Sequence, residues 1–445
     1  MERILLKNAR IVNEGRQIDG DVLIKGQFID RVDSNISDGL ARVIDLKGSL
    51  LIPGLIDDQV HFREPGLTHK GDIASESRAA VAGGITSFME QPNTVPQTTT
   101  RELLEEKFAR AAATSFANYS FLFGGTNTNL EELKRLDPRC CSGIKLFLGS
   151  STGNMLIDDE RVLEQIFRST SLVISAHCED ETTIRNNIAK YQELFGDAIP
   201  MADHPKIRST EACYLSSSRA VALAKVTGAR LHVFHVSTGI ETGLFRNDIP
   251  LAEKQITAEA CIHHLWFSDA DYAEKGSHIK WNPAVKSAED RDALWAAVLD
   301  NRIDILATDH APHTLEEKDQ PYLKSPSGGP LVQHVLPALM EKYREGIISL
   351  EQIVEKSCHN PAILFQLDRR GYIREGYFAD LTVVSENRPW TVSKGNILYK
   401  CGWSPFEDTQ FNSAVQYTFV NGHLAYDNGK ISEQRNAMRL QFNRP

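Results

Sequence analysis

The sequence lacks several features that would place the chain in other classes of protein. No apolar run reaches the roughly 18 residues of a membrane-spanning helix, and the opening MERILLKNARIVNEG lacks the layout of a signal peptide. No Lys/Arg-rich block is present, and 59 acidic residues against 49 basic ones give a formal charge of -10. We therefore expect neither a membrane nor a nucleic-acid partner.

The sequence also lacks the cysteine spacing of a disulfide framework. Its seven cysteines are an odd number and show no C-x-x-C motif, which favours reduced thiols in a cytoplasmic enzyme. Internal repeats and low-complexity tracts are absent as well. A chain of 445 residues is long enough for one large barrel and a smaller second domain.

What the sequence does contain is a regular alternation of strand-like and helical stretches. The predicted strands are 51–62, 84–91, 118–125, 143–149, 172–177, 230–237, 254–260 and 304–310, and clear helices are 100–114, 158–170 and 209–228. Eight strands alternating with helices predict an α/β fold, a (β/α)8 TIM barrel.

Both ends of the chain differ from this pattern. Residues 1–51 and 366–445 contain short strand-like pieces separated by Gly, Asn and Asp, which is typical of a small β unit. We predict that the two ends pair in one β-sandwich domain beside a metal-dependent hydrolase barrel formed by residues 52–365. The Gly-, Pro- and Ser-rich stretch 315–330 is expected to form a long mobile loop on the active face of the barrel.

Potential metal ligands stand at the ends of five predicted strands. They are His61, Lys145, His177, His235 and Asp309. A single buried histidine is more often a packing residue than a ligand. Five such residues on five strands favour a metal site instead, because the loops at the C-terminal ends of barrel strands form the active site.

Lys145 is the most informative of the five. In the strand GIKLFLG it shares a face with Phe147, and a lysine inside a barrel is unfavourable unless its charge is paired or removed. An N-carboxylated lysine would meet this requirement, because its anionic carbamate can bridge two divalent metals. The alternative is a lysine whose amine extends toward the barrel mouth.

Asp309 lies in the stretch ATDHAPHTLEEK, residues 307–318. An aspartate at a strand end can bind a metal and accept a proton from water, and His313, four residues later, can then face a substrate. The remaining histidines near these strands are expected to have packing or supporting roles: His232, His263, His264 and His310.

Residues 56–66, IDDQVHFREPG, almost reproduce the metal-binding pattern D-x-H-x-H-x-R. Asp57, His61 and Arg63 have the expected spacing, but Gln59 occupies the position of the first histidine. An amide oxygen is a weaker zinc ligand than imidazole. The exchange therefore predicts a weakened first metal position, filled through Gln59 or water, or left empty.

Arg63 follows His61 by two residues, so both should face the barrel mouth. A planar guanidinium there is suited to bidentate recognition of a carboxylate. The alternative is that Arg63 closes a salt bridge to Glu64 or Asp72.

Taken together, these motifs resemble the dihydroorotases of the amidohydrolase superfamily over the whole length of the chain. The stretches that carry the resemblance are HFREPGLTHKGD (61–72), EQPNT (90–94), GIKLFLGSSTGNM (143–155), SAHCED (175–180), HVFHVST (232–238), ATDHAPHTLEEK (307–318) and GYFADLTVV (376–384). Some bacterial members have an aspartate at the position of Lys145, so the chain resembles the carboxylated-lysine branch. The resemblance implies zinc, one or two ions per chain, and the reversible hydrolysis of dihydroorotate to N-carbamoyl-aspartate in pyrimidine biosynthesis.

The resemblance also implies roles for individual residues. Arg63, Asn93 and His313 should hold the substrate carboxylate, and Asn282, in KWNPAVKS, matches a position that reaches substrate. The first ion would be held by His61, Asp309 and the Lys145 carbamate, with Gln59 beside it. The second would be held by the same carbamate, His177 and His235.

Two other functions are compatible with these motifs. One is a cyclic-amide hydrolase of the hydantoinase or allantoinase type, which Arg63 and Asn93 disfavour because a neutral ring needs no carboxylate clamp. The other is a catalytically silent scaffold protein, for which Gln59 is the one supporting residue. The sequence leaves the assembly open, a homodimer included.

Overall fold

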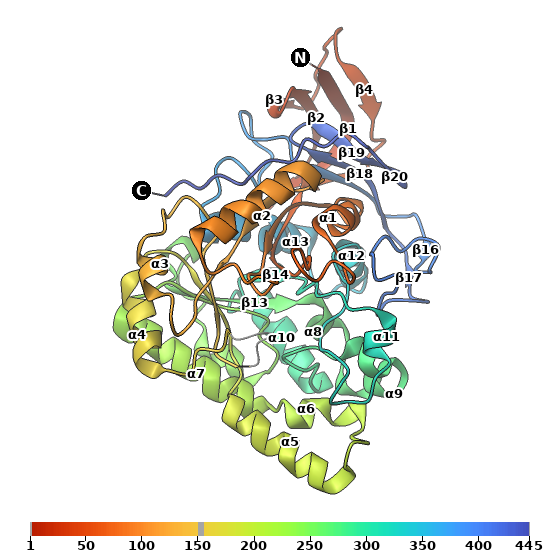
Figure 1. The fold of residues 1–445 in the computed structure, drawn as a ribbon. Helices are drawn as coiled ribbons and strands as arrows, with labels where there is room; N and C mark the ends of the chain where they lie inside the picture. The colour runs from red at the N-terminus through yellow and green to blue at the C-terminus, as the bar shows by residue number, and fades with distance from the viewer. Residues whose placement is uncertain (1, 150–154, 445) are drawn as a thin grey trace.

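The computed structural model describes residues 2–149 and 155–444. Residues 150–154, inside the motif GIKLFLGSSTGNM, lie outside this range. Figure 1 shows a helix-covered barrel with a β-sheet at one end, where strands from the red N-terminus lie beside strands from the blue C-terminus. The predicted fold class, a TIM barrel with a β unit formed by both termini, is confirmed.

The barrel is built from parallel strands that correspond to the predicted ones. They are β6 (Leu55–Val60), β7 (Ile85–Glu90), β8 (Asn118–Phe121) continued by β9 (Phe123–Gly124), β10 (Ile144–Phe147), β11 (Ile174–His177), β12 (Leu231–Val233), β13 (Ile256–Cys261) and β14 (Ile305–Ala307). A parallel bridge between Val60 and His310 links the last strand to the first and closes the ring. The C-terminal ends of all strands therefore meet at one mouth.

Helices cover the outside of the barrel. They are α1 (Ile73–Ala82), α2 (Arg101–Thr114), α3 (Leu130–Lys134), α4 (Glu160–Ser169), α5 (Glu181–Phe195), α6 (His204–Ile207), α7 (Thr210–Thr227), α8 (Ile262–Trp266), α9 (Tyr272–Lys275), α10 (Ala288–Leu299), α11 (Leu315–Lys318), α12 (Val335–Arg344), α13 (Leu350–Val354) and α14 (Asn360–Phe365). The three helices predicted from sequence are present as α2, α4 and α7. Among the described residues, no helix is long and apolar enough to cross a membrane.

Local signals explain where the predicted helices begin and end. The Thr100 and Ser209 side chains accept hydrogen bonds from the backbone N–H groups of Leu103 and Ala212 at the starts of α2 and α7. Gly228 follows α7 with φ of 77°, a left-handed conformation that glycine adopts without strain.

Strands from both termini form the second unit. Within the described residues they make one nine-stranded sheet, ordered β20-β19-β18-β15-β5-β1-β2-β3 with β4 on β1. Their bounds are β1 (Arg3–Asn13), β2 (Arg16–Lys25), β3 (Phe28–Asp33), β4 (Arg42–Asp45), β5 (Leu50–Pro53), β15 (Leu381–Ser385), β18 (Ala414–Val420), β19 (His423–Asp427) and β20 (Lys430–Ile431). A separate hairpin pairs β16 (Trp390–Thr391) with β17 (Gln410–Phe411).

The junction between the two units lies in β5. This strand pairs with β1 and β15 and ends at Pro53, and the predicted domain boundary at 51/52 falls within it. Gly54 then begins the turn into β6 at Leu55, so one short segment joins the terminal sheet to the first barrel strand.

The segment 315–330 is packed onto the barrel mouth. It begins with the short helix α11, and the buried Lys318 amine donates hydrogen bonds of 2.9 Å to the backbone oxygens of Pro326 and Gly328. The Lys280 amine donates to the backbone oxygens of Tyr322 and Ser325 at 2.6 Å. Two buried lysine amines thus fix the backbone of residues 322–328.

Candidate metal centre and substrate cavity

The ten residues singled out from the sequence line one cavity at the barrel mouth. They are Gln59, His61, Arg63, Asn93, Lys145, His177, His235, Asn282, Asp309 and His313. Phe147, Trp281, Ala311 and residues 326–328 complete the wall. The cavity volume is about 170 Å³, which is below the ~300–1,000 Å³ of pockets for drug-sized ligands and fits a small molecule.

The strands deliver the five predicted ligands from five directions. His61 follows β6 directly, Lys145 lies within β10, and His177 is the last residue of β11. His235 and Asp309 each stand two residues beyond the end of β12 and β14. All five side chains therefore converge at the C-terminal mouth of the barrel.

Backbone strain marks the same region. Arg63, His235 and Asp309 have φ angles of 68°, 38° and 49°, in the left-handed region that non-glycine residues rarely occupy. Such conformations cost on the order of 1–3 kcal/mol each and cluster at functional sites, where the surroundings hold a side chain in one direction.

His177 and His235 form one half of the centre. His177 Nδ1 lies 3.0 Å from His235 Nε2, and His177 Nε2 lies 2.9 Å from Glu179 Oε2. Burial opposes the charge on Glu179, but Arg208 beside it and the hydrogen bond from His177 lower its pKa to about 2. Glu179 therefore holds His177 with the proton on Nε2 and turns Nδ1 toward His235.

His61 and Asp309 form the other half. His61 Nε2 lies 3.3 Å from Asp309 Oδ1, and His61 Nδ1 lies 2.9 Å from Asn93 Oδ1. Gln59 is buried beside them, with its amide oxygen 3.5 Å from the Cys261 thiol. Asn93 thus contacts His61, a role that the sequence did not predict.

These distances can be compared with those of a bound ion. Bonds of about 2.0–2.1 Å in a tetrahedral site place neighbouring donor atoms about 3.3 Å apart. The separations of 3.0 Å in one half and 3.3 Å in the other are close to this value. The imidazole and carboxylate donors are also of the types that divalent transition metals prefer.

Lys145 lies between the two halves in an apolar setting. Its side chain is 1% exposed, and its amine stands 4.0 Å and 4.9 Å from the ring centres of Phe234 and Phe147. Burial lowers the pKa of Lys145 to about 7. No hydrogen bond or ion pair from this amine is found among residues 2–149 and 155–444, so its charge has aromatic faces as partners.

Asp309 is similarly withdrawn from water. Burial raises the pKa of its carboxyl group to about 7, against the opposing effects of Lys145 and His177. The indole of Trp281 donates to the backbone oxygen of Asp309 at 3.3 Å, which helps to hold the strained backbone. Asn282, next in the chain, lies on the same wall.

Arg63 and His313 contact each other on the cavity wall. Arg63 Nε donates to the backbone oxygen of Pro312 at 3.0 Å, and its Nη2 lies 3.0 Å from His313 Nε2. The Lys70 amine lies 3.0 Å from His313 Nδ1, and His313 Nε2 lies 3.1 Å from the backbone oxygen of Ser327. The loop 315–330 thereby contributes to the substrate wall.

The histidines expected to have supporting roles lie off the cavity wall. His310 Nε2 lies 2.9 Å from Glu76, and His264 Nε2 lies 3.0 Å from the backbone oxygen of Pro283. His263 stacks on Trp281 with ring centres 4.5 Å apart. His232 points into the barrel interior, away from His235.

Sequence reasoning missed three residues that contact the predicted ones. Glu179 orients His177, Cys261 contacts Gln59, and Trp281 supports Asp309. Glu179 could have been found, because it follows His177 by two residues within SAHCED. Cys261 and Trp281 are distant in sequence from the residues they contact. Their contacts can be identified only when the register of the barrel strands is known.

A TIM barrel whose mouth gathers histidines, an aspartate and a buried lysine defines the class as a metal-dependent hydrolase. A family model for the amidohydrolase family matches residues 50–425. The chain therefore belongs to the amidohydrolase family, whose members are metal-dependent.

Individual relatives are similar over nearly the whole chain. A dihydroorotase of Halobacterium salinarum is 34% identical over 95% of this chain and 98% of that protein. A dihydroorotase of Methanosarcina acetivorans is 32% identical over 97% of this chain and 94% of its own length. Among solved structures, the L-hydantoinase (dihydropyrimidinase) of Arthrobacter aurescens superposes with a TM-score of 0.94 at 27% identity, covering 99% of this chain and 100% of its own.

Proposed function

We propose that the protein is a dihydroorotase, which reversibly hydrolyses the cyclic amide of (S)-dihydroorotate to N-carbamoyl-L-aspartate. The observation that carries the proposal is Arg63. This guanidinium is buried in the cavity beside the predicted ligands and, among the described residues, forms no ion pair with a carboxylate. A buried cation in that position requires an anionic ligand.

The alternative partners of Arg63 are engaged elsewhere. Glu64 lies 3.7 Å from Arg110 and accepts a hydrogen bond from the backbone of Ile73. Asp72 lies 2.7 Å from Lys400. Neither carboxylate holds Arg63, which supports the assignment of its planar fork to the substrate carboxylate.

Arg63 also bears on the choice between the two kinds of relative. The solved structure with the TM-score of 0.94 is titled a hydantoinase, whereas curated relatives at 29–34% identity are named dihydroorotases. Backbone similarity reports the shared barrel, and function depends on the groups in the cavity. Uncharged ring substrates give Arg63 no partner, so we favour dihydroorotate over a hydantoin.

The donor set supports two zinc positions that share Lys145. The residues that would hold the first are His61, Asp309 and the Lys145 carbamate, with Gln59 beside them. His177, His235 and the same carbamate would hold the second. The nitrogens that face each other in this second set are His177 Nδ1 and His235 Nε2, and the amine of Lys145 has no polar contact among the described residues, as expected for a ligand atom.

The setting of Lys145 also supports its carboxylation. Burial lowers the pKa of this amine to about 7, so much of it is neutral near pH 7 and can attack carbon dioxide. The new C–N bond gives a carbamate, and one proton leaves the nitrogen. The product replaces the buried amine by an anion that metal ions can neutralise.

Bound metal ions would lower the pKa of a coordinated water and polarise the scissile ring carbonyl. Arg63, with Asn93 and His313, would orient the substrate through its carboxylate. Asp309 would accept the proton of the attacking water and pass it to the ring nitrogen as the C–N bond breaks. The segment 315–330 would limit the access of bulk water to the closed cavity.

The decisive experiment compares dihydroorotate with uncharged dihydrouracil. We expect turnover of dihydroorotate alone by the zinc-loaded protein. Arg63→Ala should cost about 2–5 kcal/mol of binding to the carboxylate, a rise in KM of roughly 30-fold or more. Arg63→Lys keeps the charge without the planar fork and should fall between the two.

Two outcomes would contradict the proposal. Comparable rates on dihydroorotate and dihydrouracil would favour a hydantoinase-type enzyme. No metal binding and no turnover at saturating zinc would favour the silent scaffold instead.

Compartment and assembly belong to the same proposal. All seven cysteines are free thiols, which supports a reducing, cytoplasmic compartment. A homodimer is proposed as the assembly, and light scattering of the purified protein would test it.

A further inference from the structure

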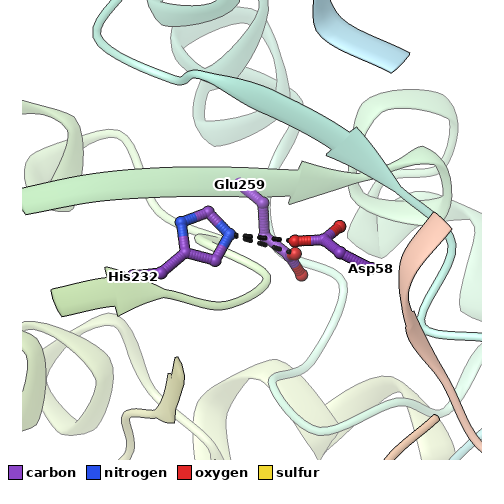
Figure 2. A group of neighbouring side chains, drawn as sticks. All are labelled: Asp58, His232 and Glu259. Atoms are coloured by element: carbon purple, nitrogen blue, oxygen red, sulfur yellow. Dashed lines mark ion pairs between the residues drawn. The ribbon is translucent and has the colours of Figure 1, made fainter. Parts of the chain in front are cut away.

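Three fully buried side chains meet in the barrel interior, away from the cavity wall. Asp58 comes from β6, His232 from β12 and Glu259 from β13, and each is 0% exposed. Figure 2 shows the imidazole of His232 pointing at both carboxylates. His232 Nε2 lies 3.2 Å from Asp58 Oδ2 and 3.4 Å from Glu259 Oε2.

The atoms that face one another have no other partners. Both carboxylate oxygens of Asp58, Oε2 of Glu259 and Nε2 of His232 make no hydrogen bond of normal geometry within the described part of the chain. His232 Nδ1 lies 2.8 Å from Thr257 Oγ1, and Glu259 Oε1 accepts from the backbone N–H of His235 at 3.1 Å. The outer atoms of His232 and Glu259 are therefore fixed, and one ligand atom of each of the three residues lies within 4.8 Å of the others.

Two buried carboxylates need a compensating cation. A protonated imidazole would supply a single charge and should form short charge-assisted hydrogen bonds of about 2.7–2.9 Å. The observed separations of 3.2 and 3.4 Å are longer than that. They match the roughly 3.3 Å between neighbouring donors of a tetrahedral ion with bonds of about 2.0–2.1 Å.

We propose that Asp58, His232 and Glu259 bind a divalent transition-metal ion of the Zn²⁺ class at a site separate from the catalytic cavity. A doubly charged ion neutralises the two carboxylates, and one imidazole with two carboxylate oxygens is a donor set that such ions accept. None of the three residues lines the cavity. The ion joins three barrel strands below the catalytic layer and has a structural role.

A crystallographic experiment locates this ion directly. The wild-type protein is expressed with added zinc chloride, and anomalous difference maps are measured on both sides of the zinc absorption edge. We expect a peak bonded to Asp58, His232 and Glu259, distinct from any peak at the cavity. Ordered side chains with no peak between them would overturn the inference and leave a protonated His232 as the counterion.

A solution experiment tests the same point by variants. His232→Asn should remove one zinc ion per chain while the cavity ions stay, and should abolish the part of the zinc-dependent rise in Tm that this site supplies. His334→Asn is the matched control, because His334 is also 0% exposed and contacts Tyr399 and Ser404 rather than carboxylates. Equal zinc content in His232→Asn and wild type would contradict the proposal, and the anomalous map decides if the variant does not fold.

Discussion

The two halves of the catalytic cavity differ in how completely their ligands are built. In the half on β11 and β12, His177 and His235 face each other at 3.0 Å, and Glu179 with Arg208 fixes the first imidazole. In the half on β6 and β14, one imidazole and one carboxylate stand 3.3 Å apart, and Gln59 lies where a second imidazole is expected. On the proposed ligand assignment, the half on β11 and β12 is complete and supported, and the half on β6 and β14 is short of one ligand.

We infer that an incomplete ligand set in one half is compatible with the proposed chemistry. The groups assigned to the reaction are Asp309 and Arg63, and both are buried in the cavity with strained backbones. Such strain clusters at functional sites, which supports a retained activity. The exchange at Gln59 should therefore weaken metal binding in one half without removing catalysis.

Removing the side chain of Lys145, which both halves share, should have the largest effect on metal content and activity. Lys145→Ala deletes the proposed bridge, so both ions and all measurable activity should be lost together. Metal analysis and a dihydroorotate assay measure the two, and added short carboxylic acids should restore part of each. Lys356→Ala is the control, because Lys356 is equally buried at 1% but donates to Asn301 and Ile303. A density map of the metal-loaded enzyme with an unmodified Lys145 amine would refute the bridge.

Removing the charge of Glu179, which orients His177, should have an intermediate effect, on zinc affinity. Glu179→Gln removes the charge that fixes His177, and such supporting partners typically contribute 10–100-fold to metal affinity. We expect the affinity for zinc at the position of His177 and His235 to fall by about that factor, as measured by competition with a chelator. Glu241→Gln is the matched control, because Glu241 is also buried but its partner is Thr238. An unchanged affinity in Glu179→Gln would mean that the two halves do not differ in support.

Much of the barrel could be predicted from the sequence because its strands are long apolar runs bounded by turn residues. The five polar residues predicted at the ends of those runs line one cavity, and their role as metal ligands stays a prediction. The terminal unit was harder, since its short strands pair between residues hundreds of positions apart, such as β5 with β15. The division of the chain at 51/52 and 365/366 stays a prediction.

Apart from Glu179–His177, the contacts that the sequence did not reveal depend on register across the barrel. Cys261 reaches Gln59 over 202 positions of sequence, and Asp58 meets His232 only because β6 and β12 lie across the interior from each other. Asp58 is adjacent to Gln59, so its side chain looked like an ordinary neighbour of the ligand strand. Period-two patterns indicate which residues share a face, but they do not indicate which faces of distant strands meet.

Placing a histidine at position 59 should have the smallest effect on activity. It tests most directly whether the two halves differ in zinc affinity. Gln59→His supplies an imidazole, a better zinc donor than an amide oxygen, so metal content should rise toward two ions per chain. Wild type should bind zinc tightly at the position of His177 and His235 and weakly at the position of His61 and Asp309. Gln59→Leu tests the amide itself. If Gln59 ligates, this variant binds the weaker ion less well than wild type, and if water fills the position the two are alike.

Turnover should persist in wild type, Gln59→His and Gln59→Leu at saturating zinc, because Asp309 and Arg63 are untouched. If wild type already holds two zinc ions as tightly as Gln59→His, the two halves are equivalent and the exchange has been compensated, with the Cys261 thiol, 3.5 Å from the Gln59 oxygen, as the nearest group to examine.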